Sequence, residues 1–310
     1  MSVTVVGSLA FDTVATPFGR RDRMLGGAAT HFALAASFFE DIHVVGPVGE
    51  DFTDEHVAVL ATRGTDVADV ERISGGRTFF WSGEYGWDLN TRETLDTQLN
   101  VFEHFAPKLS AASRGCDVLF LANIQPALQR AVLEQCAAEF VALDSMNLWI
   151  EIARDALTAV MARVDCVILN DAELRQLTGR PNLVTAARDV LALGPSVVVA
   201  KQGEYGAALI TSDGFFSLPA YPLETVVDPT GAGDTFAGGF VGYLARHLDQ
   251  AGDPEVLRRA MAYGTALASY NVERFGTDRV AKLTAAEIHD RVDRLQEMTR
   301  FDHLPAPLVG

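Results

Sequence analysis

The sequence predicts an α/β fold: a doubly wound, mostly parallel central sheet with flanking helices, and a small second β-sheet. Two observations predict the central sheet: short apolar strands recur along the chain, and helical segments separate them. Strands without polar alternation are typical of a parallel sheet that is covered on both faces. A third observation predicts the second sheet, since residues 77–101 alternate like exposed antiparallel strands.

The predicted elements alternate in chain order. Segments rich in Val, Ile or Leu are expected to form the central strands, at 3–6, 42–45, 117–123, 140–145, 165–170 and 196–203. Segments with helical patterns are expected to cover the sheet, at 28–39, 52–62 and 234–247. A polar amphipathic helix is expected after Leu283.

Segments 13–25 and 77–101 are more polar and are expected to pair into a lid lobe over one edge of the central sheet. The chain shows no internal repeat and no linker long enough to divide it into two independent units. We therefore predict a single domain over residues 1–310.

Two glycines, Gly238 and Gly239, lie inside the predicted helix 234–247. Each costs about 1 kcal/mol there relative to alanine. Close packing of this helix on a neighbour would explain both residues, because glycine carries no side chain.

Composition and charge narrow the classes of function. The chain has 310 residues, of which 48% are hydrophobic and 21% charged, so it can bury a large core. Its formal net charge of -16 would repel a phosphate backbone, which argues against a nucleic-acid or anionic-membrane partner. The N-terminus begins directly with a strand pattern, and no apolar run reaches the roughly 18 residues of a membrane helix. A cytoplasmic protein with reduced cysteines is expected.

Polar side chains follow most of the predicted strands: Asp12, Asn123, Asp144, Asn147, Asn170, Lys201, Asp228 and Asp234. Ligands of open parallel sheets bind at the carboxyl ends of the strands. Any one of these residues could be a turn former or a helix cap. Their recurrence after most strands predicts a binding site at this edge of the sheet.

The segment 226–240, VVDPTGAGDTFAGGF, has the most specific pattern. Gly231, Ala232 and Gly233 lead into a predicted helix, whose first N–H groups lack intrahelical acceptors and attract anions. Asp234 lies in the first turn, so a carboxylate stands beside this candidate anion hole. The pair suits transfer of a phosphoryl group to a hydroxyl, with the carboxylate accepting the proton. The local string fits a helix cap on a tight turn equally well.

Two other sequence motifs contain candidate ligands of phosphate and metal. In LNDAEL, Asn170 and Glu173 lie one helical turn apart, and a carboxylate with water is what Mg²⁺ prefers. The alternative is that Glu173 only stabilises the first turn of its helix. In KQGEYGA, Lys201 ends a strand beside Gly203 and Gly206, and it could meet nucleotide phosphates or be a surface lysine.

Together these motifs resemble the ribokinase (PfkB) superfamily of sugar and nucleoside kinases. DPTGAGDTFAGGF resembles the C-terminal signature of that family. Further motifs resemble the family in the same order over nearly the whole chain: VVGSLAFDTV, GGAATHFALAA, LNDAEL and KQGEYGA. The resemblance implies a ribokinase-like fold, ATP as phosphate donor, Mg²⁺ as cofactor, and a lid that often supplies a homodimer surface.

The resemblance also implies roles for the motif residues. Asp234 would be the catalytic base beside an anion hole of Gly231, Ala232 and Gly233. The expected acceptor-binding residues are Asp12, Gly26, Gly27, His31 and Asn123. The expected nucleotide-side residues are Asn170, Glu173, Lys201, Gly203 and Gly206, with Glu173 organising Mg²⁺ through water. Asp228 and Thr230 fall where many members of the family bind a monovalent cation such as K⁺.

One departure from the family pattern concerns the acceptor. The double-glycine motif usually carries an Asn that contacts a sugar hydroxyl, and the matching position here is His31. The lid is also rich in aromatic residues that could stack on a base or a sugar, or pack within the sheet: Phe79, Phe80, Trp81, Tyr85 and Trp87. The predicted acceptor is therefore a sugar hydroxymethyl group, with a nucleoside of the adenosine, inosine or cytidine type as the alternative.

Other classes of protein fit the sequence less well. A nicotinamide-dependent oxidoreductase would need G-x-G-x-x-G after its first strand, and the chain has GSLAF there. A P-loop kinase would need G-x-x-x-x-G-K-[ST], which the sequence lacks. A catalytically silent sugar-binding protein on the same scaffold is less consistent with Asp234, because loss of the base is the usual sign of such a protein.

Overall fold

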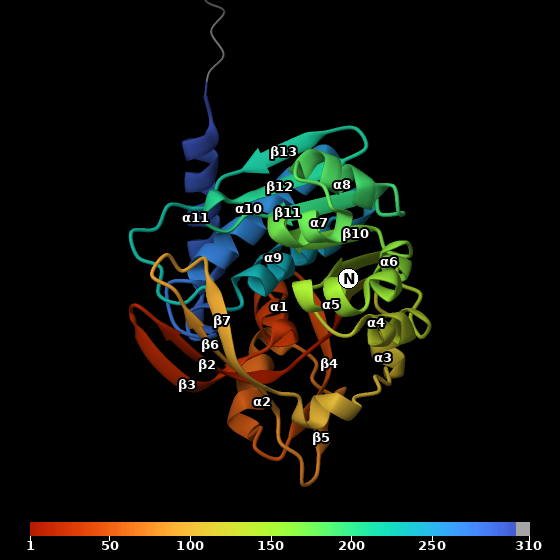
Figure 1. The fold of residues 1–310 in the computed structure, drawn as a ribbon, viewed down its shortest axis with the longest axis vertical. Coiled ribbons are helices and arrows are strands. Elements are labelled where there is room, and N and C mark those ends of the chain that lie inside the picture. The colour runs from red at the N-terminus through yellow and green to blue at the C-terminus, as the bar shows by residue number, and fades with distance from the viewer. Residues whose placement is uncertain (302–310) are drawn as a thin grey trace, which may run out of the picture.

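The computed structural model describes residues 1–301, so 302–310 of the predicted domain lie outside the described residues. A nine-stranded sheet runs in the order β13-β12-β11-β10-β9-β8-β1-β4-β5 (Figure 1). Its parallel strands are β1 (Ser2–Val6), β4 (Asp41–Gly49), β5 (Val70–Ile73), β8 (Val118–Leu121), β9 (Phe140–Asp144), β10 (Cys166–Asn170) and β11 (Val197–Lys201). β12 (Ala207–Thr211) and β13 (Phe215–Leu218) add an antiparallel edge. The predicted doubly wound, mostly parallel sheet is confirmed.

Helices cover both faces of this sheet, which explains the continuous apolar strands. One face packs against α1 (Ala28–Ala36), α2 (Asp54–Leu60), α9 (Ala232–Arg246) and α10 (Pro254–Asn271). The other packs against α4 (Pro126–Leu133), α5 (Asn147–Ile152), α6 (Arg154–Met161), α7 (Asp171–Thr178) and α8 (Leu183–Leu191). α3 (Ala111–Arg114) precedes β8, and α11 (Ala285–Thr299) packs beside α1 and α10. None of the helices within residues 1–301 is both long and apolar enough to cross a membrane.

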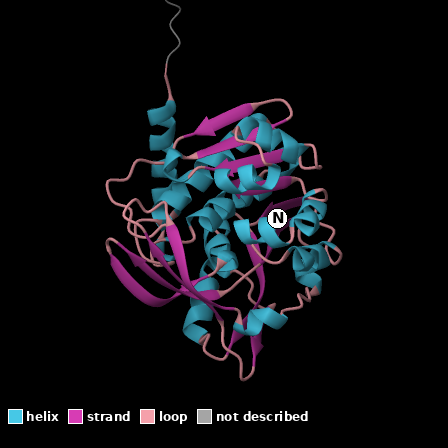
Figure 2. Ribbon diagram, in the orientation of Figure 1, coloured by secondary structure: helices cyan, strands magenta, loops and turns pink. Residues whose placement is uncertain are grey.

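A separate four-stranded sheet lies to one side of the central sheet, at the lower left of Figure 2. Its order is β3-β2-β6-β7, formed by β2 (Ala10–Thr16), β3 (Gly19–Gly26), β6 (Phe79–Tyr85) and β7 (Arg92–Gln98). The predicted small β-sheet is thus present, and it includes one parallel pair, β2 with β6. Asp12 lies beyond the first strand of the central sheet, as expected, and is part of β2 in the small sheet.

The packing of α9 explains the glycines within it. A Cβ atom on Gly238 would lie 2.3 Å from the Phe32 carbonyl oxygen of α1. One on Gly239 would lie 2.8 Å from a methyl group of Leu267 in α10. The predicted tight contact is confirmed, and it holds the N-terminus of α9 in a defined place against both neighbours.

The Gly238 contact predicts a stability effect opposite to helix propensity. We expect Gly238→Ala to lower the free energy of unfolding by about 1–3 kcal/mol, because overpacking outweighs the helix preference of alanine. The measurement is the urea midpoint of unfolding. Gly252→Ala is the control, since an added Cβ there has no heavy atom within 4 Å. A Gly238→Ala protein as stable as the wild type would contradict the contact.

Candidate active site

The N-terminus of α9 presents backbone N–H groups toward the edge where the parallel strands end. Gly231 is the N-cap residue and has a φ of 73°, a left-handed conformation that favours glycine. The first i to i−4 hydrogen bond of the helix runs from the Thr235 amide to the Gly231 carbonyl, at 2.8 Å. The amides of Gly233 and Asp234 precede that bond, in the turn that lacks intrahelical acceptors. This turn has the geometry of an anion hole.

Asp234 lies in the first turn of α9 and is half-buried. The pKa of Asp234 is raised to about 7, chiefly by burial and then by the nearby Asp144 carboxylate. Lys201 acts in the opposite direction. A carboxyl group with a pKa near neutrality suits a general base, because it can accept a proton and remain reactive at cellular pH.

Lys201 and Asp144 form an ion pair beside the α9 N-terminus. Lys201 Nζ lies 2.9 Å from Asp144 Oδ2, and the two side chains are 17% and 5% exposed. A Cβ on Gly233 would lie 3.0 Å from Lys201 Nζ, so this glycine lets the ammonium group approach the turn. Burial alone would lower the pKa of Lys201, but Asp144, Glu173 and Asp234 outweigh it and raise the pKa. The lysine is therefore held as a cation at the candidate anion hole.

Asp12 reaches the same region from the small sheet. The pKa of Asp12 is raised to about 7, chiefly by burial and then by Asp228, while the hydrogen bond from the Gly27 amide acts in the opposite direction. The carboxylate lies directly against Gly26, where a Cβ would be only 1.9 Å from Oδ2. Gly27 has a φ of 95° and passes close to the Ser8 carbonyl. The double glycine therefore makes room for Asp12 as well as for the turn into α1.

Asn170 and Glu173 form a reciprocal cap at the start of α7. Asn170 Oδ1 accepts a hydrogen bond from the Glu173 amide at 2.7 Å, and Glu173 Oε2 accepts one from the Asn170 amide at 2.8 Å. The capping role considered for Glu173 is thus present. Burial raises the pKa of Glu173 to about 7, with Lys201 lowering it and Asp144 raising it. Through residue 301, no group of three or more His, Cys, Asp or Glu side chains could hold a metal by itself.

Asp228 is fully buried just before the glycine turn, which is the turn formed by Gly231, Ala232 and Gly233. Its Oδ1 accepts a hydrogen bond from the Thr230 amide at 2.9 Å, and its Oδ2 accepts one from the Gly276 amide at 3.0 Å. Burial raises the pKa of Asp228, and these amides act in the opposite direction. No Lys, Arg or His within residues 1–301 forms an ion pair with this carboxylate.

His31 lies beneath the glycine turn and is 2% exposed. Its Nδ1 is 3.1 Å from Asn271 Oδ1 of α10, and a Cβ on Gly231 would be 2.4 Å from the His31 ring. Burial lowers the pKa of His31 to about 4, although the bond to Asn271 acts to raise it. The imidazole is therefore neutral at physiological pH.

Three predicted site residues lie in other surroundings. Asn123 Oδ1 accepts a hydrogen bond from Trp149 Nε1 at 3.1 Å. Gly203 has a φ of 58° and faces Asn90 of the β6–β7 turn. Gly206 has a φ of 98°, and a Cβ there would lie 2.0 Å from the Leu218 carbonyl oxygen, so the backbone packing already requires glycine.

Two side chains of the small sheet act on the site: Tyr85, one of the aromatic lid residues considered from the sequence, and Arg92, which the sequence did not single out. Thr230 Oγ1 lies 3.3 Å from the Tyr85 hydroxyl, which joins β6 to the glycine turn. The charge of Arg92 in β7 partly offsets the burial that raises the pKa of the carboxyl groups Asp12, Glu173 and Asp234. No local motif marks Arg92, because its position depends on the pairing of β7 with β6 and of β6 with β2.

The chain was compared with known proteins. The model of the pfkB family carbohydrate kinases matches residues 3–283. A cytidine kinase of Thermococcus kodakarensis is 30% identical over 252 residues, which are 79% of this chain and 89% of that protein. A fructokinase of Klebsiella pneumoniae is 26% identical over 310 residues, 94% of this chain and 98% of that protein.

The fold of the chain also matches a solved structure, a ribokinase II of E. coli in complex with ATP and Mg²⁺. That match has a TM-score of 0.74 and 21% sequence identity, and it covers 94% of this chain and 99% of the other. The sequence match over most of the chain and the shared architecture lead to one conclusion. The chain belongs to the pfkB family of carbohydrate kinases and is a kinase of that type.

Proposed function

We propose that this kinase transfers the γ-phosphoryl group of ATP to a hydroxymethyl group of a sugar, with a nucleoside as the alternative acceptor. The observation that carries the proposal is Asp234, a half-buried carboxyl group with a raised pKa in the first turn of α9. It lies beside free amides and the Lys201 ammonium group. The relatives include both a fructokinase and a cytidine kinase, so both acceptor classes are kept.

The proposed chemistry follows from the charges at this turn. The oxygen of the acceptor hydroxyl forms a bond to the γ-phosphorus while Asp234 accepts the proton of that hydroxyl. The bond from the γ-phosphorus to the bridging oxygen breaks, and ADP leaves. The turn of Gly231, Ala232 and Gly233 directs N–H groups at the phosphoryl oxygens. Lys201 adds a fixed positive charge there without a reorganisation cost.

The nucleotide side is proposed to lie along the ends of β10 and β11. Asn170 and Glu173 are the residues that would organise Mg²⁺ through water, consistent with a single carboxylate there rather than a cluster. When bound, Mg²⁺ would neutralise phosphate charge. Gly203 and Gly206 shape the turn after Lys201, on which the nucleotide would rest. The neighbour solved with ATP and Mg²⁺ supports this choice of donor and cofactor.

Acceptor binding is proposed for the opposite side of the glycine turn. Asp12 supplies a carboxylate for acceptor hydroxyls, and Gly26 and Gly27 let the acceptor approach the backbone. Asn123 is proposed to contribute from the end of β8. The small sheet would be a lid over this side, because Tyr85 already contacts Thr230.

Asp228 and Thr230 are proposed to bind a monovalent cation such as K⁺. The Asp228 carboxylate is completely buried, and the charge it carries has no ion-pair partner among residues 1–301. A buried charge without a partner is costly, so a bound cation would stabilise the ionised form. We therefore expect the kinase activity to be higher with K⁺ than with a bulky organic cation.

The remaining proposals concern assembly and location. All seven residues of β7 are exposed, and Leu95 within it is 51% exposed, so we propose a homodimer through the small sheet. Sedimentation as a monomer would contradict that pairing. A single functional domain and a cytoplasmic location are proposed as well, supported by the use of ATP and by the free thiols of Cys116, Cys136 and Cys166.

The role of Asp234 predicts a large loss of turnover without loss of nucleotide binding. We expect Asp234→Asn to lower kcat by roughly 10²–10⁴, because the amide cannot accept the proton. In the wild type, kcat/KM should rise as the pH passes through about 7, where the carboxyl group loses its proton. Both quantities are measured by ADP release.

Asp155→Asn is the matched control, because Asp155 is an exposed acidic residue in the first turn of α6. It should retain wild-type kcat. Near-normal turnover in Asp234→Asn, or a wild-type profile that is flat across pH 7, would show that Asp234 is not the base.

The acceptor is identified by measuring ADP release across sugars, sugar phosphates, polyols and nucleosides, with and without K⁺. With the acceptor that turns over, we expect Asp12→Ala to raise the acceptor KM by about tenfold or more, because a charge-assisted hydrogen bond is lost. The KM for ATP should change little. Asp22→Asn, on the exposed part of β3, is the control. Equal effects on both KM values would place Asp12 outside the acceptor site.

A further inference from the structure

A hollow of about 660 Å³ lies between the β2–β3 hairpin and the segment that follows α10. Its lining residues are mostly basic or apolar: Phe18, Arg21, Val227, Arg274, Phe275, Asp278, Arg279 and Lys282. None of them belongs to the residues proposed to bind ATP, Mg²⁺ or the acceptor. The volume is that of pockets which hold small organic ligands.

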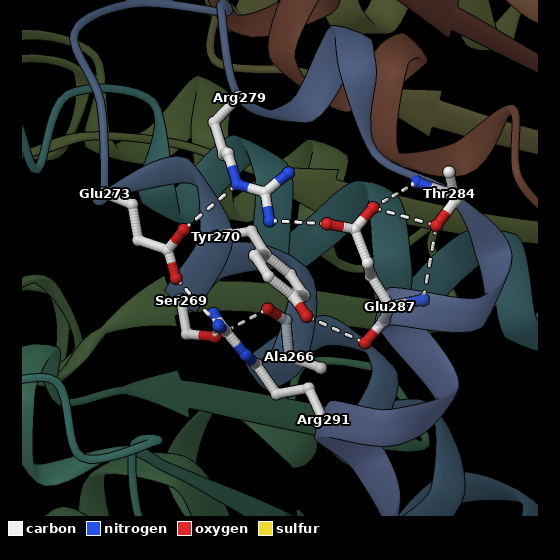
Figure 3. Close-up of polar contacts among 8 residues, drawn as sticks. All are labelled: Ala266, Ser269, Tyr270, Glu273, Arg279, Thr284, Glu287 and Arg291. Atoms are coloured by element: carbon white, nitrogen blue, oxygen red, sulfur yellow. Dashed lines mark hydrogen bonds and ion pairs between the residues drawn. The ribbon is translucent and has the colours of Figure 1, made fainter.

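One wall of the hollow is fixed by a network of ion pairs, shown in Figure 3. Arg279 lies between two carboxylates, 3.0 Å from Glu273 and 2.8 Å from Glu287. Arg291 of α11 also binds Glu273, at 2.7 Å, and its guanidinium group stacks 3.3 Å from the centre of the Tyr270 ring. The charge of Arg279 is thus already neutralised, and the segment that carries it is held in place.

The other cations of the hollow have no such partners. In the hairpin, Arg20 pairs with Asp22 and Arg23 pairs with Asp51, whereas Arg21 faces the hollow. On the facing wall, the cations without a neutralising partner are Arg274 and Lys282. Across residues 1–301, none of Arg21, Arg274 and Lys282 lies within ion-pair distance of a carboxylate.

We propose that this hollow is a second anion site, which takes a phosphorylated small molecule. Three unneutralised cations face one acid, Asp278, in a protein whose formal net charge is -16. Three like charges gathered with a single carboxylate repel one another, and a multivalent anion would relieve that repulsion. Phe18 and Phe275 provide apolar walls beside the cations, so the ligand can carry a ring as well as a phosphate.

The hollow also adjoins elements of the candidate active site. Thr16 Oγ1, at the end of β2, donates a hydrogen bond to the Val227 carbonyl at 3.0 Å. Val227 directly precedes Asp228, whose carboxylate is held by the Gly276 amide from the opposite wall. β2 also carries Asp12. An anion that joins the hairpin to this wall would therefore brace the strand on which Asp12 stands.

The test uses pyrophosphate and AMP as calorimetric probes of the full-length protein in Mg²⁺-free buffer, and the comparison of two triple variants separates the hollow from the catalytic site. We expect saturable binding that weakens as salt is added. Replacing Arg21, Arg274 and Lys282 by Gln together should weaken it by about 100-fold or more, since each charge-assisted contact is worth about tenfold. Tighter binding of AMP than of pyrophosphate would show that the hollow recognises a nucleotide. Equal binding of the two probes would show that it recognises the phosphate groups alone.

The control replaces three exposed arginines elsewhere, Arg163, Arg188 and Arg259, by Gln. It changes the net charge equally, so it should bind both probes like the wild type. The proposal is overturned if neither probe binds the wild type. It is also overturned if the two triple variants weaken binding by the same factor.

A second, independent observation concerns the tautomer of His31. Asn271 Nδ2 donates to the Thr230 carbonyl at 2.7 Å, which fixes the orientation of the amide and makes its oxygen the acceptor for His31. The same oxygen accepts from the Thr235 hydroxyl at 3.1 Å. His31 Nδ1 must therefore carry the proton, and Nε2 is left with a lone pair. Among the described residues, this buried Nε2 has no hydrogen-bond partner.

We infer that His31 is a positioning residue for the anion hole. Its ring lies against Gly231, the left-handed N-cap of α9, and its Nδ1–H ties α1 to Asn271 of α10. The neutral imidazole ring of His31 therefore packs against the glycine turn and holds it in place before Asp234. This inference rests on the proposed phosphoryl transfer, and it assigns His31 to turnover rather than to acceptor binding.

The test separates kcat from KM in His31→Asn, once the wild type has a measured acceptor. We expect kcat to fall about 10- to 100-fold with the acceptor KM within about twofold, because the hole is displaced while the acceptor site stays intact. A raised acceptor KM with unchanged kcat would make His31 an acceptor ligand and overturn the inference. A wild type without activity on any acceptor would instead contradict the proposed function.

A double-mutant cycle tests the contact itself. Gly231→Ala should lower kcat more in the wild type than in a His31→Ala background, because the added methyl group then has space. Strictly additive effects would show that the ring does not support the turn. Asn182→Ala, an exposed helix cap of α8, is the control that should show no coupling to Gly231.

Discussion

The ion pair between Lys201 and Asp144 is the interaction on which the candidate active site depends. It joins the carboxyl ends of β9 and β11 and sets an ammonium group against Gly233, where an added Cβ would lie 3.0 Å from Lys201 Nζ. Removal of one partner would leave an uncompensated buried charge, which typically costs several kcal/mol. Because Lys201 also offsets the burial of Asp234 and Glu173, this one contact influences both the proposed base and the proposed metal-organising residue.

The architecture around this pair fixes the direction of α9. Strand ends supply the acids and the lysine from one side, and glycine contacts with α1 and α10 hold the helix from the other. The N–H groups of the first turn consequently point at the edge of the sheet where the polar residues gather. A rigid arrangement of dipoles and charges of this kind is what electrostatic catalysis of phosphoryl transfer requires.

Charge balance also explains why the site suits its proposed ligands. Asp12, Asp228 and Asp234 lie close enough for Asp228 and Asp234 to raise the pKa of Asp12. Within residues 1–301 the nearby cations are fewer than the acids, so a divalent metal and a monovalent cation would improve the balance. The hollow behind Asp228 has the opposite character, with three unneutralised cations, and so fits an anion. The two regions meet at the segment from Val227 to Asp228.

The sequence by itself determined the fold class and the family, because buried strands, helix starts and the DPTGAGDTFAGGF turn are local patterns with local physical causes. It also placed Asp234 and the glycine turn together, since they are adjacent in the chain. Only the tertiary structure decided what faces that turn. The ring of His31 beneath Gly231, Lys201 against Gly233, and Arg92 from the small sheet come from distant segments. Their positions depend on strand pairing and helix packing over long range, which no local pattern records.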